Sequence, residues 1–220
     1  MSVTKRAQRI CDILIEEYGN EIATRRLPPV DELIVTILSQ NTADVNTSRA
    51  FARLNEKFSN WEELLEAPDE EIEDAIRVSG FFRIKTERIK AALSEIRERV
   101  GALDLSHLEE MPLAEAKEWL TSLHGVGPKT AAIVLLFSFG RPALPVDTHV
   151  WRVTKRLGLI DGDTSREKAH ELLEDIIPKS CIFSLNHNLV THGRNICRAR
   201  RPLCEQCVLR QDCDYFRSQN

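Results

Sequence analysis

One lysine stands where a free amine could act as a nucleophile. Residues 121–130 read Thr-Ser-Leu-His-Gly-Val-Gly-Pro-Lys-Thr, in which the glycines allow a tight turn and Pro128 suits the first position of a helix. Lys129 then lies in the first turn, where the partly positive helix N-terminus disfavours a second positive charge. A lysine that gives up its proton is a nucleophile that forms Schiff bases. Lys129 is therefore a candidate catalytic residue, although its position alone is more typical of a solvated lysine beside a turn.

The glycine turn offers a second kind of chemistry through its backbone. Two helices joined by such a hairpin leave N–H groups without a partner at the start of the second helix, and such groups bind anions. The amides of Gly125, Val126 and Gly127 are therefore candidates for contact with a phosphate group.

Four cysteines near the C-terminus are spaced as ligands of a metal or a cluster. The pattern C-x6-C-x2-C-x5-C is formed by Cys197, Cys204, Cys207 and Cys213. Four thiolates in one short segment can hold a [4Fe–4S] cluster or a zinc ion. Zinc sites usually contain two close pairs of cysteines, and here only Cys204 and Cys207 form such a pair. The spacing alone does not decide between a [4Fe–4S] cluster and a zinc ion.

The segment around these cysteines is basic, although the chain as a whole is acidic. Between Val190 and Arg210 the sequence has five arginines and a single acid, Glu205. The formal net charge of the chain is −4 and its pI about 5.9, which is unusual for a protein that binds nucleic acid. A contact with DNA would therefore depend on a local patch. The candidate phosphate contacts in the first cysteine loop are Arg198, Arg200 and Arg201.

Composition restricts the class of protein further. The chain of 220 residues is 42% hydrophobic, enough for one large core or two modest ones. Its longest apolar run, Ala131–Phe137, is far too short to cross a membrane, and charged residues interrupt the apolar ones in residues 1–20, unlike in a signal peptide. Cysteines gathered near one end favour an intracellular metal site over a disulfide framework. We therefore expect a cytoplasmic protein.

The elements that must position these residues are expected to be helices. Apolar residues recur at helical spacing, and no stretch alternates convincingly as a strand would, so we expect an all-α chain of roughly ten short helices. The helix Ala131–Phe139 is apolar nearly all round and should be buried. Asp31 is expected to cap a helix at 32–38 after a linker at Pro28-Pro29, and Asp147 could cap a helix that begins at Thr148. Other helices are expected at 4–18, through Phe51 and Phe58, and at 61–67, 69–78, 85–99, 111–123, 165–177 and 182–197.

Two of these motifs together resemble a known family. Residues 123–131, Leu-His-Gly-Val-Gly-Pro-Lys-Thr-Ala, followed by Val-Asp-Thr-His at 146–149, look like the helix–hairpin–helix and aspartate signature of the endonuclease III family of DNA glycosylases. The cysteine spacing matches the cluster of that family position for position, which tips the choice toward a [4Fe–4S] cluster. His124 departs from the proline usual at its place. The resemblance extends from about residue 5 to residue 216.

The resemblance implies a fold and a catalytic pair. Residues 30–141 would form a six-helix barrel that ends in the hairpin motif at 112–139, and residues 1–29 would join 142–220 in a helical cluster domain. Lys129 falls on the family's Schiff-base lysine and Asp147 on its catalytic aspartate, and the two side chains would face one cleft. The expected reaction is removal of a damaged base, chiefly an oxidised pyrimidine, followed by β-elimination at the abasic site.

The family also fills the gap left by an extruded base with protein side chains. By alignment Asn41 falls on the family's gap-filling glutamine, with Gln40 as the alternative one residue away, although either could simply belong to a capped helix end. Phe81 and Phe82 stand beside Arg83, and an apolar wedge next to a basic residue suits insertion into a base stack. Paired phenylalanines are, however, more often part of a core.

The expected partner is therefore double-stranded DNA with damaged bases or abasic sites, bound by a monomer, which in a prokaryote would associate with the nucleoid. Two alternatives remain. A mismatch glycosylase of the adenine-removing type would carry a glutamate where this chain has Thr36, would lack Lys129, and has a C-terminal domain for which this chain has no room. A DNA-binding protein without catalysis would need the hairpin and the cluster, but neither Lys129 nor Asp147.

Overall fold

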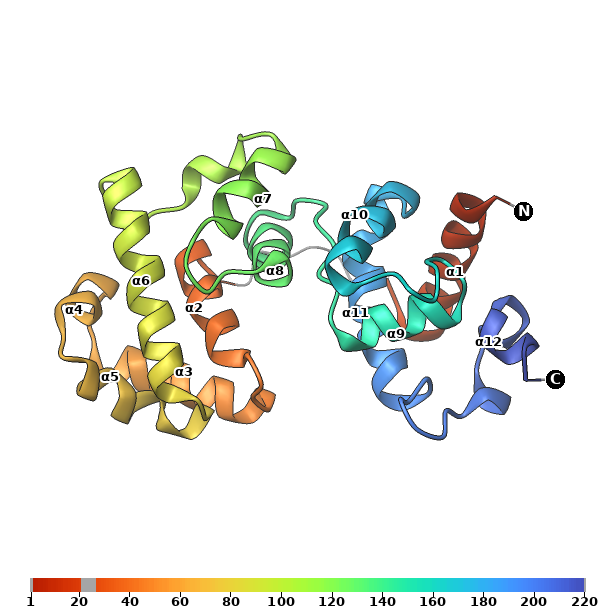
Figure 1. The fold of residues 1–220 in the computed structure, drawn as a ribbon, viewed down its shortest axis with the longest axis horizontal. Coiled ribbons are helices and arrows are strands. Elements are labelled where there is room, and N and C mark those ends of the chain that lie inside the picture. The colour runs from red at the N-terminus through yellow and green to blue at the C-terminus, as the bar shows by residue number, and fades with distance from the viewer. Residues whose placement is uncertain (1, 21–26, 220) are drawn as a thin grey trace. The chain divides into compact units, whose positions relative to one another are not determined.

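The structure, a computed structural model, describes residues 2–20 and 27–219, and every regular element in these ranges is a helix (Figure 1). The described residues form two units, one of residues 27–141 and the other of residues 2–20 with 142–219. The expected all-α class is confirmed. No helix in these ranges is long and apolar enough to cross a membrane.

The unit of residues 27–141 is built around two apolar helices. Its α-helices are α2 (Pro29–Ser39), α3 (Asp44–Lys57), α4 (Trp61–Glu66), α5 (Asp69–Ile76), α6 (Phe82–Val100), α7 (Leu113–Thr121) and α8 (Pro128–Phe139), and its 3₁₀ turns are η1 (Arg77–Ser79) and η2 (Ser106–Glu109). Helix α8 packs on α2 and α7, and α2 also contacts α3 and α6. Because α8 is apolar on nearly every side, it is buried from Ala131 through Leu136 except for Ile133, which is half-buried.

The second unit places the N-terminal helix among helices from the C-terminal half. Its α-helices are α1 (Val3–Tyr18), α9 (Thr148–Arg156), α10 (Arg166–Ile176), α11 (Ile182–Asn195) and α12 (Asp214–Arg217), and its 3₁₀ turns are η3 (Lys179–Cys181), η4 (Cys204–Gln206) and η5 (Arg210–Asp212). Helix α11 packs against α1 and α9. Ile10 and Leu14 of α1 and Leu185 and Leu189 of α11 are fully buried, so a heptad-like stripe on each helix supplies this core.

Most helix ends lie where local signals predict them. Gly19 ends α1 with a positive φ of 96°, and Pro128 occupies the first turn of α8. The expected start of α2 was wrong: the helix begins at Pro29, after Pro28, and Asp31 is not its cap. The Asp31 carboxylate instead accepts a hydrogen bond from the Trp61 indole N–H at 2.7 Å, so it joins α2 to α4.

Candidate active site and cysteine pocket

The glycine hairpin is a tight turn between α7 and α8. The Val126 N–H donates to the Leu123 carbonyl at 3.1 Å, and the Val126 side chain is buried beneath the turn. Gly125 has a φ of 77°, and a Cβ there would lie 2.5 Å from Cγ of Arg88, so both the backbone angle and the close approach require glycine. The first amides of α8 have no acceptor within the helix, which makes this end of α8 suited to an anion.

Lys129 is exposed in the first turn of α8, directly after Pro128. Its neighbours Thr130 and Ala131 are buried, so the helix is anchored while the lysine side chain faces solvent. An amine on a rigid helix end, beside the hairpin amides, is placed to meet a bound phosphodiester chain.

Asp147 is the N-cap of α9, as the sequence allowed. Its Oδ1 accepts hydrogen bonds from the N–H groups of His149 and Val150, both at 2.8 Å, and its side chain is half-buried. Arg152, one turn along α9, donates to the carbonyl oxygens of Cys197 at 2.9 Å and Gly193 at 2.8 Å. Arg152 therefore fixes α9, the helix that Asp147 caps, to α11 and to the start of the cysteine segment. Lys129 and Asp147 belong to different units, and their predicted shared cleft stays a prediction.

The candidate gap-filling residues lie on two loops with unusual backbone angles. Among the described residues, the only non-glycine residues with positive φ are Asn41 (54°), Phe81 (49°) and Arg201 (52°). This left-handed conformation is disfavoured for residues with a Cβ, most of all for a bulky side chain, and it is often found at functional sites. All three residues are among the DNA contacts that the sequence indicated.

The local contacts separate the two members of each candidate pair. Gln40 is held in place, because its Oε1 accepts from Arg88 and its Nε2 donates to the Gly125 carbonyl at 3.4 Å, whereas Asn41 is exposed. Phe82 is half-buried beneath the Arg77 guanidinium at 4.7 Å, whereas the Phe81 side chain is 63% exposed. Asn41 and Phe81 are thus the exposed members of the two pairs.

The basic loop between Cys197 and Cys204 is held from one side by Arg156 of α9. The Arg156 guanidinium donates to the carbonyl oxygens of Arg198 at 2.7 Å and Ala199 at 3.1 Å. The side chains of Arg198, Arg200 and Arg201 are exposed. A loop with a fixed backbone presents these charges as a defined surface. Sequence reasoning missed Arg156, because only the fold brings α9 to this loop.

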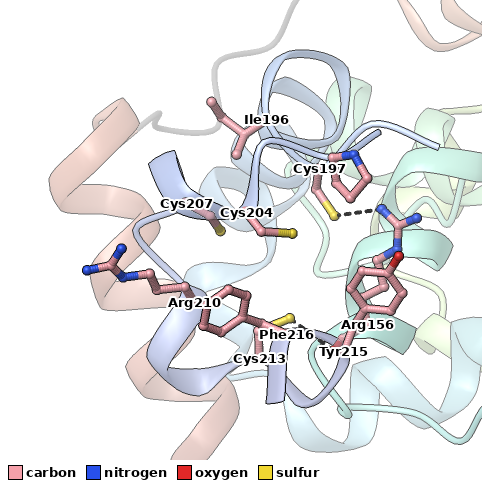
Figure 2. A pocket seen from close by; sticks show the side chains of 10 residues that line it. Arg156, Ile196, Cys197, Cys204, Cys207, Arg210, Cys213, Tyr215 and Phe216 are labelled. Carbon is pink, nitrogen blue, oxygen red and sulfur yellow. Dashed lines mark hydrogen bonds between the residues drawn. The ribbon is translucent and has the colours of Figure 1, made fainter. Parts of the chain in front are cut away.

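The four cysteines line one pocket, with their sulfur atoms around a common space (Figure 2). The pocket holds about 290 Å³ of space between atoms, part of it open to solvent, and none of the four cysteines forms a disulfide. Within the described ranges, no three His, Cys, Asp or Glu side chains are arranged to hold a single metal ion. A space lined by four cysteines offers the four ligands that a [4Fe–4S] cluster takes.

The surroundings of the sulfurs also suit a cluster. Burial raises the pKa of Cys207 to about 11 and also raises that of Cys213, so these thiols would ionise only beside a positive group such as iron. Arg156 Nη1 donates to Cys197 Sγ at 3.3 Å, and His192 Nε2 lies 3.5 Å from Cys207 Sγ. Hydrogen bonds of this kind to ligand sulfurs are the usual outer contacts of iron–sulfur centres.

Comparison with known proteins identifies both the region that contains the hairpin and the cysteine segment. Residues 34–179 match the family model of the HhH-GPD superfamily of base excision DNA repair proteins, and residues 197–213 match the iron–sulfur binding domain of endonuclease III. Endonuclease III of Thermotoga maritima is 39% identical over 210 residues, which cover 93% of this chain and 94% of that protein. Endonuclease III of Sulfolobus acidocaldarius is 34% identical over 186 residues, or 84% of this chain and 81% of the relative.

Solved structures agree with the sequence relatives. A trapped covalent intermediate of endonuclease III with DNA is 30% identical, with a TM-score of 0.84, and the match covers 100% of this chain and 99% of that one. These findings confirm the HhH-GPD fold, the [4Fe–4S] cofactor and a DNA partner. The chain therefore belongs to the endonuclease III family of the HhH-GPD superfamily, the bifunctional DNA glycosylases and AP lyases of base excision repair.

Proposed function

We propose that this enzyme removes oxidised pyrimidines from duplex DNA with Lys129 as its nucleophile and Asp147 as its charged partner. The observation that carries the proposal is the exposed amine of Lys129 at the rigid start of α8, immediately after the glycine hairpin. A further support is the trapped covalent intermediate with DNA found for a relative that the whole chain matches.

The proposed reaction begins at the sugar of the flipped nucleotide. The neutral Lys129 amine attacks C1′ of the flipped nucleotide, and the bond from C1′ to the base breaks with its electron pair leaving on the base, which takes up a proton. The attacking amine passes a proton to Asp147. The bond from C1′ to O4′ then breaks, O4′ takes up a proton from Asp147, and a Schiff base is left between Lys129 and C1′. Loss of a proton from C2′ then expels the 3′ phosphate, which nicks the strand. Hydrolysis of the Schiff base frees Lys129.

Asp147 has two proposed tasks. Its carboxylate stabilises the positive charge that develops on the sugar as the base leaves, and it accepts the lysine proton. Because both cap hydrogen bonds go to Oδ1, Oδ2 is not used by the cap. The proposal requires Lys129 and Asp147 to reach the same nucleotide.

DNA is proposed to be held by three groups of residues. The amides of Gly125, Val126 and Gly127 bind the phosphate chain near the lesion, and Asn41 and Phe81 enter the base stack where the nucleotide has been flipped out. The phosphates farther along are bound by Arg198, Arg200 and Arg201. The exposed side chains of Asn41, Phe81 and the three arginines support the assignment. The left-handed backbone of Asn41, Phe81 and Arg201 supports it as well.

The cluster is proposed to be structural. Cys197, Cys204, Cys207 and Cys213 would ligate it, and its chemistry here would be limited to bonding those four thiolates and so fixing the basic loop. In this division residues 30–141 form the barrel domain and residues 1–29 with 142–220 the cluster domain. The enzyme is proposed to act as a monomer in the compartment that contains the DNA.

A panel of duplexes tests the substrate class. Duplexes that carry an oxidised pyrimidine, an oxidised purine or an adenine mismatch are incubated with the enzyme, and base release and strand cleavage are followed separately. We expect the oxidised pyrimidine to be released fastest, with a nick that needs no added base or heat. Faster release from either other duplex would change the assigned lesion. Base release without a nick would favour the monofunctional mismatch type.

A further inference from the structure

Helix α6 buries a lysine beneath the two loops that carry Asn41 and Phe81. Only 1% of Lys85 is exposed, and it is the largest fully buried side chain among the described residues. Its Nζ donates to the Leu38 carbonyl at 2.7 Å, the Thr42 hydroxyl at 2.6 Å and the Ser79 carbonyl at 2.8 Å. All three ammonium protons therefore have acceptors, which is what a buried lysine requires.

The three acceptors come from two separate segments, the end of α2 with the turn that follows it and the 3₁₀ turn η1. Leu38 and Thr42 flank Asn41 at the end of α2, and Ser79 stands two residues before Phe81. The Thr42 hydroxyl lies 2.5 Å from the Ser79 carbonyl, so the loops also contact one another directly. One ammonium thus fixes both loops from below.

A second basic residue of α6 joins the same loops to the hairpin. Arg88, three residues after Lys85, donates to Gln40, which in turn donates to the Gly125 carbonyl. The Arg88 side chain also lies where a Cβ of residue 125 would be. The exposed ends of three loops are therefore held by two side chains of one helix.

Asn41 and Phe81 need such support. Both have a left-handed backbone, which asparagine tolerates but which a bulky phenylalanine keeps only where the surroundings impose it. A buried ammonium is itself costly, and burial lowers the pKa of Lys85 to about 8. A leucine or methionine would fill the same space without that cost, so the lysine is explained by the hydrogen bonds it makes and not by packing.

We propose that Lys85 is a positioning residue for base flipping, which holds Asn41 and Phe81 in the conformation that enters the DNA stack. The inference rests on the gap-filling role proposed above for those two residues. Preset loops need no ordering when the base is flipped, and a small displacement of a positioned group can cost about a hundredfold in rate.

The test compares two substrates for each variant. Lys85→Met keeps the length of the side chain but removes all three donors. We expect single-turnover release of an oxidised pyrimidine from duplex DNA to fall at least about tenfold. Nicking of a ready-made abasic site in single-stranded DNA, which has no gap to fill, should stay within about twofold. The matched control is Lys90→Met on the same helix, whose Nζ bonds Ala67 and Asp69 instead and which should leave both rates unchanged.

A second background shows whether Lys85 acts through the loops. In the double variant Asn41→Ala, Phe81→Ala, the change Lys85→Met should cost nothing further, because the side chains it positions are absent. An equal loss in both backgrounds would overturn the inference and leave the gap-filling role intact. Full duplex excision by Asn41→Ala, Phe81→Ala would instead remove the gap-filling role itself, and the inference with it.

A folding failure would not leave the question open. If Lys85→Met does not fold by circular dichroism, Thr42→Val decides, since it removes the hydroxyl that Lys85 and Ser79 share and keeps the shape of the side chain. We expect it to slow duplex excision more than single-strand nicking. If Thr42→Val changes both rates by the same factor relative to wild type, the positioning role is refuted.

Discussion

Asp147→Asn separates a catalytic charge from a helix cap. Oδ1 of Asp147 accepts two N–H groups at 2.8 Å, and an asparagine carbonyl oxygen can accept the same two bonds. Asparagine and aspartate are about equally good N-caps. The remaining loss is the attraction between a negative charge and the helix N-terminus, worth about 0.3–1 kcal/mol. We therefore expect the free energy of unfolding to fall by no more than about 1 kcal/mol.

The expected effect on catalysis is much larger. Removal of one electrostatic contribution to a transition state costs about 10²–10³ in rate, or about 2.7–4 kcal/mol. Base release from an oxidised-pyrimidine duplex, measured under single turnover, should therefore fall by at least about two orders of magnitude. Nicking of a ready-made abasic site should fall less, because the bond to the base is already broken.

A second cap supplies the control. Ser165 caps α10 in the same unit by accepting from the Lys168 N–H at 3.2 Å. Ser165→Ala should lower stability by about 0.5–2 kcal/mol and leave base release unchanged. Full base release by a folded Asp147→Asn enzyme would exclude a catalytic role for Asp147 and leave it as a helix cap alone.

Three further predictions concern other parts of the chain. The pKa of Lys85 is about 8 in the folded chain against an ordinary 10.5, so between these pH values the unfolded chain binds one proton more than the folded chain. The free energy of unfolding of wild type, measured by urea titration relative to Lys85→Met, should therefore rise by about 1.4 kcal/mol per pH unit from pH 8 to 10.5. Below pH 8 this difference should not change with pH. Parallel pH profiles would contradict the expected rise. Arg200→Ala and Arg201→Ala should each lower the slope of log affinity against log salt by about one, and an unchanged slope in both would move the DNA surface elsewhere. Protein purified without oxygen should be yellow-brown with about four irons and four sulfides per chain, and stoichiometric zinc without iron would exclude the cluster.

Local signals were sufficient for much of the fold. The glycine after α1, the proline at the start of α8 and the aspartate before α9 each act on their nearest backbone, so sequence spacing predicts their effect. The start of α2 was misplaced because Pro29 suits the first helical position, and because Asp31 has an acceptor role for Trp61 that lies thirty residues away.

The contacts of Lys85 and Arg88 with the loops that carry Asn41 and Phe81 could not be predicted from local sequence signals. The sequence predicted a helix at 85–99 but assigned no role to Lys85. Its three acceptors lie at the end of α2, in the turn after it and in η1, which only the fold brings together. A signal was nevertheless present, since Lys85 stands four residues before the buried Ile89 and so on the apolar face of α6. The choice between Gln40 and Asn41 likewise depends on Arg88, which spacing cannot place beside them.

Identification of the amine that bonds to DNA decides whether Lys129 is the nucleophile. Enzyme, a duplex with an oxidised pyrimidine and sodium borohydride are mixed, so that reduction freezes any Schiff base, and the adduct is digested and mapped by mass spectrometry. We expect one adduct, on Lys129, that is absent in Lys129→Ala and retained in Lys117→Ala on the first helix of the hairpin. Undiminished trapping by folded Lys129→Ala, or an adduct mapped to another amine, would contradict this role of Lys129.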